Sequence, residues 1–136
     1  MLNHITMKNR SGQAMVEFAM TLPLLALLLF AIIQYGFIFG AYMTLRHGAH
    51  AAARSASLAG ADTGTSNITA VASSSITPML DPVNLQSVDI TSTTVGGLAA
   101  YTVQLNYNLP LIIKYVVPNA TGNILALKAN ATYRKN

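Results

Sequence analysis

The sequence contains no cysteine and no tryptophan, and only 9% of its 136 residues are charged. Without cysteine the chain has neither a disulfide framework nor a thiolate metal site. Four acidic residues and three histidines are all that it offers as carboxylate or imidazole acids, bases and ligands. We therefore expect a structural or assembly role, with no enzymatic activity, small-molecule substrate, cofactor or bound metal.

Basic residues exceed acidic ones but are scattered. Eight Lys and Arg against four Asp and Glu give a net charge of +4, carried by isolated residues. Nucleic-acid-binding proteins gather such residues into a patch or stripe, so nucleic acid is not an expected partner. Hydrophobic residues make up 52% of the chain, and a soluble domain usually has about 25% charged residues. Part of the chain is therefore expected to lie outside water.

One uncharged run, residues 18–45, is 28 residues long. About 20 residues suffice to cross a hydrocarbon core of roughly 30 Å, so this run predicts a transmembrane helix. The apolar region of a cleaved secretory signal is only about 7 to 15 residues, which favours a retained anchor. Lys8 and Arg10 precede the run, while Arg46 and Arg54 follow it. The flanking charges are equal in number and do not orient the helix.

Glu17 stands immediately before this run, at the end of the sequence GQAMVE. An acid in the apolar part of a membrane helix costs about 2.5 kcal/mol or more unless it is paired. No basic residue lies on its helical face in the following turns, but a cut after Gly12 would give Gln13 a new α-amino group. Glu17 would then lie four residues from that amine, near the positive end of the helix dipole. The alternative is an interfacial glutamate whose carboxylate reaches the headgroups.

The run GQAMVEF and the following TLPLL resemble the processing site of type IV pilin-like proteins. With the Gly/Ala-rich continuation and the C-terminal strand pattern, the chain resembles the TadE-like minor pseudopilins of tight-adherence (Tad, Flp-type, type IVc) pili. The resemblance implies that Gly12 ends the leader, Gln13 is the mature N-terminus and Glu17 neutralises a terminal amine during assembly. The implied partners are the membrane, a prepilin peptidase, other pilin or pseudopilin subunits and the Tad inner-membrane assembly proteins.

The resemblance also implies a location and a topology. The protein would cross the bacterial inner membrane once, with its N-terminus in the cytoplasm and its C-terminal domain outside, and could enter the pilus itself. Its function would be pilus assembly for surface adherence. The alternative function is that of a bitopic, membrane-anchored binding or envelope protein that keeps its leader and joins no filament.

The expected organisation is a leader at residues 1–12, a long helix at 13–60 and an extracytoplasmic α+β domain at 61–136. Pro23 predicts a kink in the helix because it removes a backbone hydrogen bond. Small residues recur every four positions on the helix, which indicates close packing against neighbouring helices. The main members of this stripe are Gly36, Gly40 and Gly48. The alternative is that the stripe has no packing role and arises because Gly and Ala are common in membrane helices.

The C-terminal domain is predicted to be pilin-like, with a short helix and a small antiparallel sheet of about three strands. Ser66 or Thr65 can cap the helix, which should end before Pro78. Residues 85–95, 101–109 and 125–134 fit the strands, with a hairpin signal at Gly96-Gly97. The sheet is expected to lean on small alanines of the outer half of the long helix. The apolar segment 109–118 is either a buried crossover, which we favour, or a contact patch.

Three weaker signals indicate other chemistry. Asp62 begins a D-T-G-T string that resembles an aspartic-protease loop, but it follows an Ala-rich helix and is better explained as a turn. His47 and His50 share a helical face, yet no third metal ligand is near in sequence. The triplets at Asn67, Asn119 and Asn130 fit glycosylation sites, although the abundance of Asn and Thr explains them.

Overall fold

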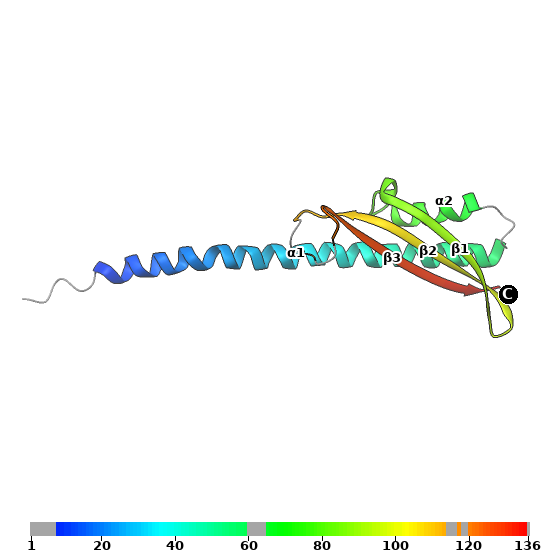
Figure 1. Cartoon of the computed structure of the whole chain (residues 1–136), viewed down its shortest axis with the longest axis horizontal. Helices are drawn as coiled ribbons and strands as arrows, with labels where there is room; N and C mark the ends of the chain where they lie inside the picture. Colours follow the sequence, from blue (N-terminus) through cyan, green and yellow to red (C-terminus); the bar gives the residue numbers. More distant parts are fainter. Residues whose placement is uncertain (1–7, 60–64, 114–116, 118–119, 136) are drawn as a thin grey trace, which may run out of the picture. The chain divides into compact units, whose positions relative to one another are not determined.

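The computed structural model describes residues 8–59, 65–113, 117 and 120–135. Its elements are α1 (Lys8–Ala59), α2 (Thr65–Ile76), the short 3-10 helix η2 (Pro82–Asn84), β1 (Leu85–Val95), β2 (Leu98–Pro110) and β3 (Ile124–Arg134) (Figure 1). A long helix, a short helix and a three-stranded antiparallel sheet confirm the predicted α+β class. The chain forms two compact units, residues 1–35 and 36–136, and each is described by itself.

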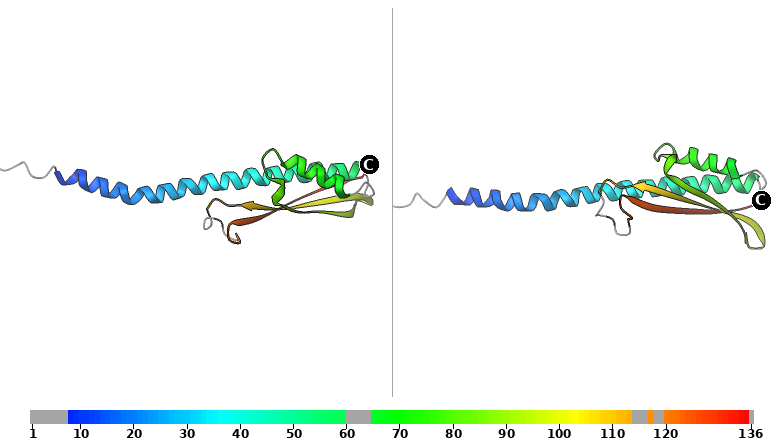
Figure 2. Two further views of the ribbon diagram at one scale, coloured as in Figure 1. Left: turned by 90° about the horizontal axis from the view of Figure 1, so that it is seen from above. Right: turned by 45° about the horizontal axis from the view of Figure 1, so that its top comes forward.

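The first unit consists, in its described part, of the N-terminal portion of α1. The helix continues through Pro23 and bends within its first third, the blue portion in Figure 2. A bend is expected where proline removes a hydrogen bond from the helix. Large apolar side chains, among them Phe18, Leu24 and Ile32, are exposed along this portion. Such a surface is stable only against lipid or other apolar helices.

The apolar part of α1 meets the requirements of a membrane span. Among the described residues, one stretch, Gly12–Leu58, is long and apolar enough to cross a bilayer. Its most apolar window has a mean hydropathy of 2.4, and none of that window is buried. The helix therefore supports the predicted membrane anchor.

The second unit contains a sheet in which β2 lies between β1 and β3, antiparallel to both. The turn from β1 to β2 consists of Gly96 and Gly97, whose φ angles are +62° and +80°. Two positive φ angles are the signature of the type I′ turn, whose twist matches that of the strands it joins. A side chain in this left-handed conformation costs roughly 1–2 kcal/mol, which explains the two glycines. The predicted hairpin is confirmed.

Alternating residues of β2 form the centre of the core. Tyr101, Val103, Leu105 and Tyr107 are buried on the face that meets the helices. The residues between them are partly exposed. This alternation is the one predicted for residues 101–109, and the observed strand extends it at both ends.

Within the second unit, α2 and the outer half of α1 lie against this face of the sheet (Figure 1 and Figure 2). The α1 contribution includes four fully buried alanines, Ala49, Ala52, Ala53 and Ala56. Their small side chains let the helix axis lie close to the sheet, as predicted. From α2, Ile68, Ala72 and Ile76 complete the core.

The opposite face of the sheet is polar. Asn106 Nδ2 donates hydrogen bonds to Ser87 Oγ at 2.7 Å and to Asp89 Oδ2 at 2.9 Å. The hydroxyl oxygens of Thr102 and Thr132 lie 2.8 Å apart and share a hydrogen bond. An antiparallel sheet with one apolar and one polar face is suited to a core on one side and water on the other.

The apolar segment 109–118 contains both buried and exposed residues. Leu111 is buried and donates its backbone N–H to the carbonyl oxygen of Asn123 at 2.7 Å. Ile112, by contrast, is 77% exposed. Residues 114–116 and 118–119 of this segment lie outside the described residues, so the choice between crossover and contact patch stays open.

Candidate processing and assembly site

The predicted cleavage site and its acid lie on one continuous helix. Gly12, Gln13 and Glu17 are all exposed residues of α1. The Gln13 side-chain amide donates a hydrogen bond from Nε2 to Glu17 Oε1 at 3.2 Å. Helical residues four positions apart share a face, and side chains lean toward the helix N-terminus. The Glu17 carboxylate therefore points toward the residue that a cut after Gly12 would make the first.

Gly12 is sterically open. A Cβ atom built at this position would meet no other atom within 4 Å. Its neighbour Gln13 is exposed as well. In the helical form seen here, however, the backbone N–H and carbonyl groups are engaged within the helix, and a peptidase needs an extended substrate. Cleavage after Gly12 would thus require the start of α1 to unwind, which is easiest near a helix end because terminal turns fray.

The three glycines of the predicted packing stripe have different surroundings. A Cβ at Gly36 would meet nothing within 4 Å, whereas one at Gly40 would lie 3.2 Å from Met79 Cε. A Cβ at Gly48 would lie only 2.7 Å from Ile76 Cγ2 of α2. Gly48 thus packs within its own chain. Packing of the stripe against a neighbouring subunit stays a prediction. At Gly36 the space beside the helix is free for such a neighbour.

Two features of α1 were not predicted from the sequence: the burial of Gln34 and the contact of His50 with β3. Gln34 is 3% exposed and has an interaction partner, although it lies within the uncharged run. A lone amide among apolar residues is the signal that would have pointed to it. The ring of His50 meets the ring of Tyr133 edge-on, with centroids 6.0 Å apart and planes at 83°. That contact joins residues 83 positions apart, and no local pattern predicts it.

Among the described residues, no three or more His, Cys, Asp or Glu side chains lie close enough together to hold a metal ion. Asp62, the residue of the protease-like string, lies outside the described residues.

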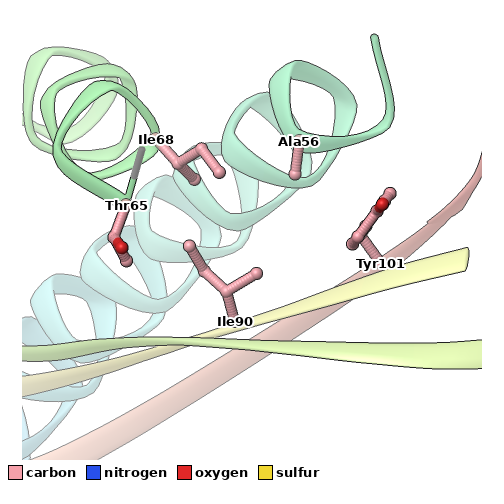
Figure 3. A pocket seen from close by; sticks show the side chains of 5 residues that line it. All are labelled: Ala56, Thr65, Ile68, Ile90 and Tyr101. Atoms are coloured by element: carbon pink, nitrogen blue, oxygen red, sulfur yellow. The ribbon is translucent and has the colours of Figure 1, made fainter. Parts of the chain in front are cut away.

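A small cavity of about 190 Å³ lies between the helices and the sheet of the second unit. Figure 3 shows its lining, which comes from Ala56, Thr65, Ile68, Ile90 and Tyr101. The only polar atoms on these side chains are two hydroxyl groups, and none is charged. These side chains therefore supply no carboxylate, imidazole or amine to the cavity, and no set of metal ligands.

In comparisons with known proteins, one family model matches part of the long helix. The model of the family described as TadE-like protein matches residues 12–54. No curated protein and no solved structure matches the chain. The matched segment begins at Gly12 and covers most of α1. The match agrees with the resemblance inferred from the sequence, and it covers the segment from Gly12 to Arg54.

Proposed function

We propose that the protein is a minor pseudopilin that acts in the assembly of a Tad-type pilus. The observation that carries this proposal is the hydrogen-bonded pair of Gln13 and Glu17 at the start of the TadE-like segment. The pair stands between a basic leader and an exposed apolar helix. A precursor of this kind needs all three parts: a leader, an acid at the fifth mature position and a membrane helix.

The first step is hydrolysis of the peptide bond between Gly12 and Gln13 by a prepilin peptidase. Water adds across the bond, so that the leader ends in a Gly12 carboxylate and Gln13 acquires an α-amino group. The cut also removes Lys8 and Arg10, which leaves six basic and four acidic residues and a net charge of +2. The amine has a reference pKa near 7.7–8.0 and is largely protonated at neutral pH.

The second step is charge pairing at the lipid boundary. The Glu17 carboxylate accepts hydrogen bonds from the new ammonium group, either of its own chain or of a neighbouring subunit. Pairing lowers the free-energy cost of holding the carboxylate and the ammonium group in an apolar environment when the helices leave the bilayer together. Because the pair forms only when the two helix ends are level, it also sets the register of adjacent helices.

The protein would lie in the bacterial inner membrane, with the N-terminus in the cytoplasm and the second unit outside. The polar face of the sheet then contacts water or other subunits, and α1 contacts lipid. The partners are other pilin or pseudopilin subunits and the Tad inner-membrane assembly proteins. The assembled pilus attaches the cell to surfaces. The chain itself catalyses no reaction.

Deletion of the gene tests the assembly role. We expect cells lacking the protein to carry at least tenfold fewer surface pili by electron microscopy, because a missing assembly component stops fibre growth. Expression of the full chain from a plasmid should restore them. Normal numbers of pili in the deletion strain would contradict the proposal and favour the alternative function, a membrane-anchored envelope protein outside any filament.

A further inference from the structure

A groove on α1 in the second unit gathers basic side chains. Its volume is about 180 Å³, and it is lined by Met43, Arg46, His47 and His50. Arg46 and His47 are exposed, and His50 is half-buried beside Tyr133. These residues lie beside the buried face of α1, because Arg46 directly follows the buried Leu45 and His50 directly follows the buried Ala49.

Among the described residues, no acidic side chain neutralises the positive charge of this groove. No hydrogen bond or ion pair joins Arg46 or His47 to another residue in the part of the chain that the structure describes. From Phe18 to Ala59, α1 contains no acidic residue. Asp81 and Asp89, the described acids of the second unit, belong to the segment before η2 and to β1. The Arg46 guanidinium therefore has no anionic partner among the described residues.

The groove also lies where α1 leaves its apolar stretch. The uncharged run ends at Leu45, and Arg46 is the first charged residue after it. On a helix with a rise of about 1.5 Å per residue, Arg46 lies roughly 15 Å beyond Gly36, the first residue of the second unit. Long basic side chains lean back toward the helix N-terminus and extend to the headgroup layer, which adds roughly 5–7 Å to each side of the hydrocarbon core.

We propose that this groove binds the phosphate of an anionic phospholipid, such as phosphatidylglycerol, at the membrane surface. The Arg46 guanidinium would donate two parallel hydrogen bonds to phosphate oxygens, the geometry for which arginine is suited. Ring N–H groups of His47 and His50 would donate to the remaining oxygens. Met43, one helical turn nearer the membrane, would contact the glycerol and the first acyl carbons.

The contact with Tyr133 fixes one wall of the site. Its ring, on β3, meets the His50 ring edge-on and restricts its orientation. A lipid held by Arg46 and His50 would therefore also fix the sheet, through β3, relative to the membrane surface. This inference requires that α1 crosses a membrane, but it does not depend on a role in the pilus.

Native mass spectrometry of the full chain tests the site. The protein is reconstituted in vesicles of equal parts phosphatidylglycerol and phosphatidylcholine, extracted in mild detergent, and analysed for retained lipid. We expect the wild type to retain one phosphatidylglycerol and the Arg46→Gln/His47→Gln variant to retain it about tenfold less. Arg54→Gln is the matched control, because Arg54 is exposed on the same helix but does not line the groove.

Three results would overturn the proposal. In the first, the double variant retains as much phosphatidylglycerol as the wild type. In the second, Arg54→Gln loses as much lipid as the double variant, which would indicate a general effect of charge. Displacement of the lipid by millimolar inorganic phosphate would show that free phosphate is the ligand. Far-UV circular dichroism checks folding, and Arg46→Gln alone carries the same prediction if the double variant does not fold.

Discussion

Cells that produce the Glu17→Gln variant are expected to process the protein normally yet to assemble at least tenfold fewer pili than the wild type. The substitution keeps the size of the side chain and one acceptor oxygen but removes its charge. The ammonium group of Gln13 then remains unpaired beside the apolar run. Such a charge costs about 2.5–3.5 kcal/mol at the centre of a membrane helix and less near its ends, so the loss corresponds to at most a few hundredfold in an equilibrium constant. Electron microscopy of pili and the intact mass of the membrane-bound protein measure the two effects.

Glu17→Asp is the matched control for this experiment. It keeps the negative charge and shortens the side chain by one methylene group, so it should support more assembly than Glu17→Gln. If Glu17→Gln cells carry pili in wild-type numbers, charge pairing is not required. If the amide variant is not processed, Glu17 acts in recognition by the peptidase instead.

The second large effect is expected at Gly48, where α1, α2 and the sheet meet. A Cβ here would lie 2.7 Å from Ile76 Cγ2 and 3.4 Å from Leu105 Cδ1. The Ile76 methyl group cannot turn away easily, because β-branched side chains are held in one rotamer in a helix. Overpacking of a core costs about 1–3 kcal/mol, while replacing glycine by alanine in a helix returns up to about 1 kcal/mol. Gly48→Ala should therefore destabilise the second unit by up to about 2 kcal/mol, measured by thermal unfolding in detergent.

Two further variants separate steric crowding from other effects. Gly36→Ala makes the same change where nothing lies within 4 Å, so it should leave the unfolding temperature unchanged or raise it. Adding Ile76→Leu to Gly48→Ala removes the methyl group at the point of contact and keeps the side-chain volume, so part of the lost stability should return. Equal destabilisation at Gly36 and Gly48, or no recovery in the double variant, would show that the α1–α2 contact does not set the stability.

The sequence predicted the local elements well because their signals are themselves local. The alternation of Tyr101, Val103, Leu105 and Tyr107 defines a strand with one buried face. The two glycines at 96 and 97 define its turn, since both need positive φ angles. The 28-residue uncharged run similarly requires a long apolar helix.

Long-range contacts could not be predicted in the same way. Gly36, Gly40 and Gly48 belong to one repeating pattern, yet only the tertiary structure shows that Gly48 meets Ile76 of its own chain. The contact of His50 with Tyr133 and the basic groove beside it depend on where β3 lies. Burial of Gln34 likewise has no local pattern beyond the presence of an amide in an apolar run.

The candidate site was predicted more completely in its geometry than in its chemistry. The spacing of Gln13 and Glu17 places both on one helical face, and the hydrogen bond between their side chains agrees with that placement. The proposed positive partner is different, because it does not exist in the uncut chain. A cut after Gly12 would create it, so neither the sequence nor the structure of the uncut chain contains it.

The intact mass of the protein recovered from cell membranes tests this central claim most directly. In cells with an active prepilin peptidase, the account predicts a product that lacks residues 1–12 and begins at Gln13. In cells without the peptidase, the full chain of 136 residues should persist. Recovery of the full-length chain while the peptidase is active would contradict the account, because Glu17 would then have no terminal amine to neutralise.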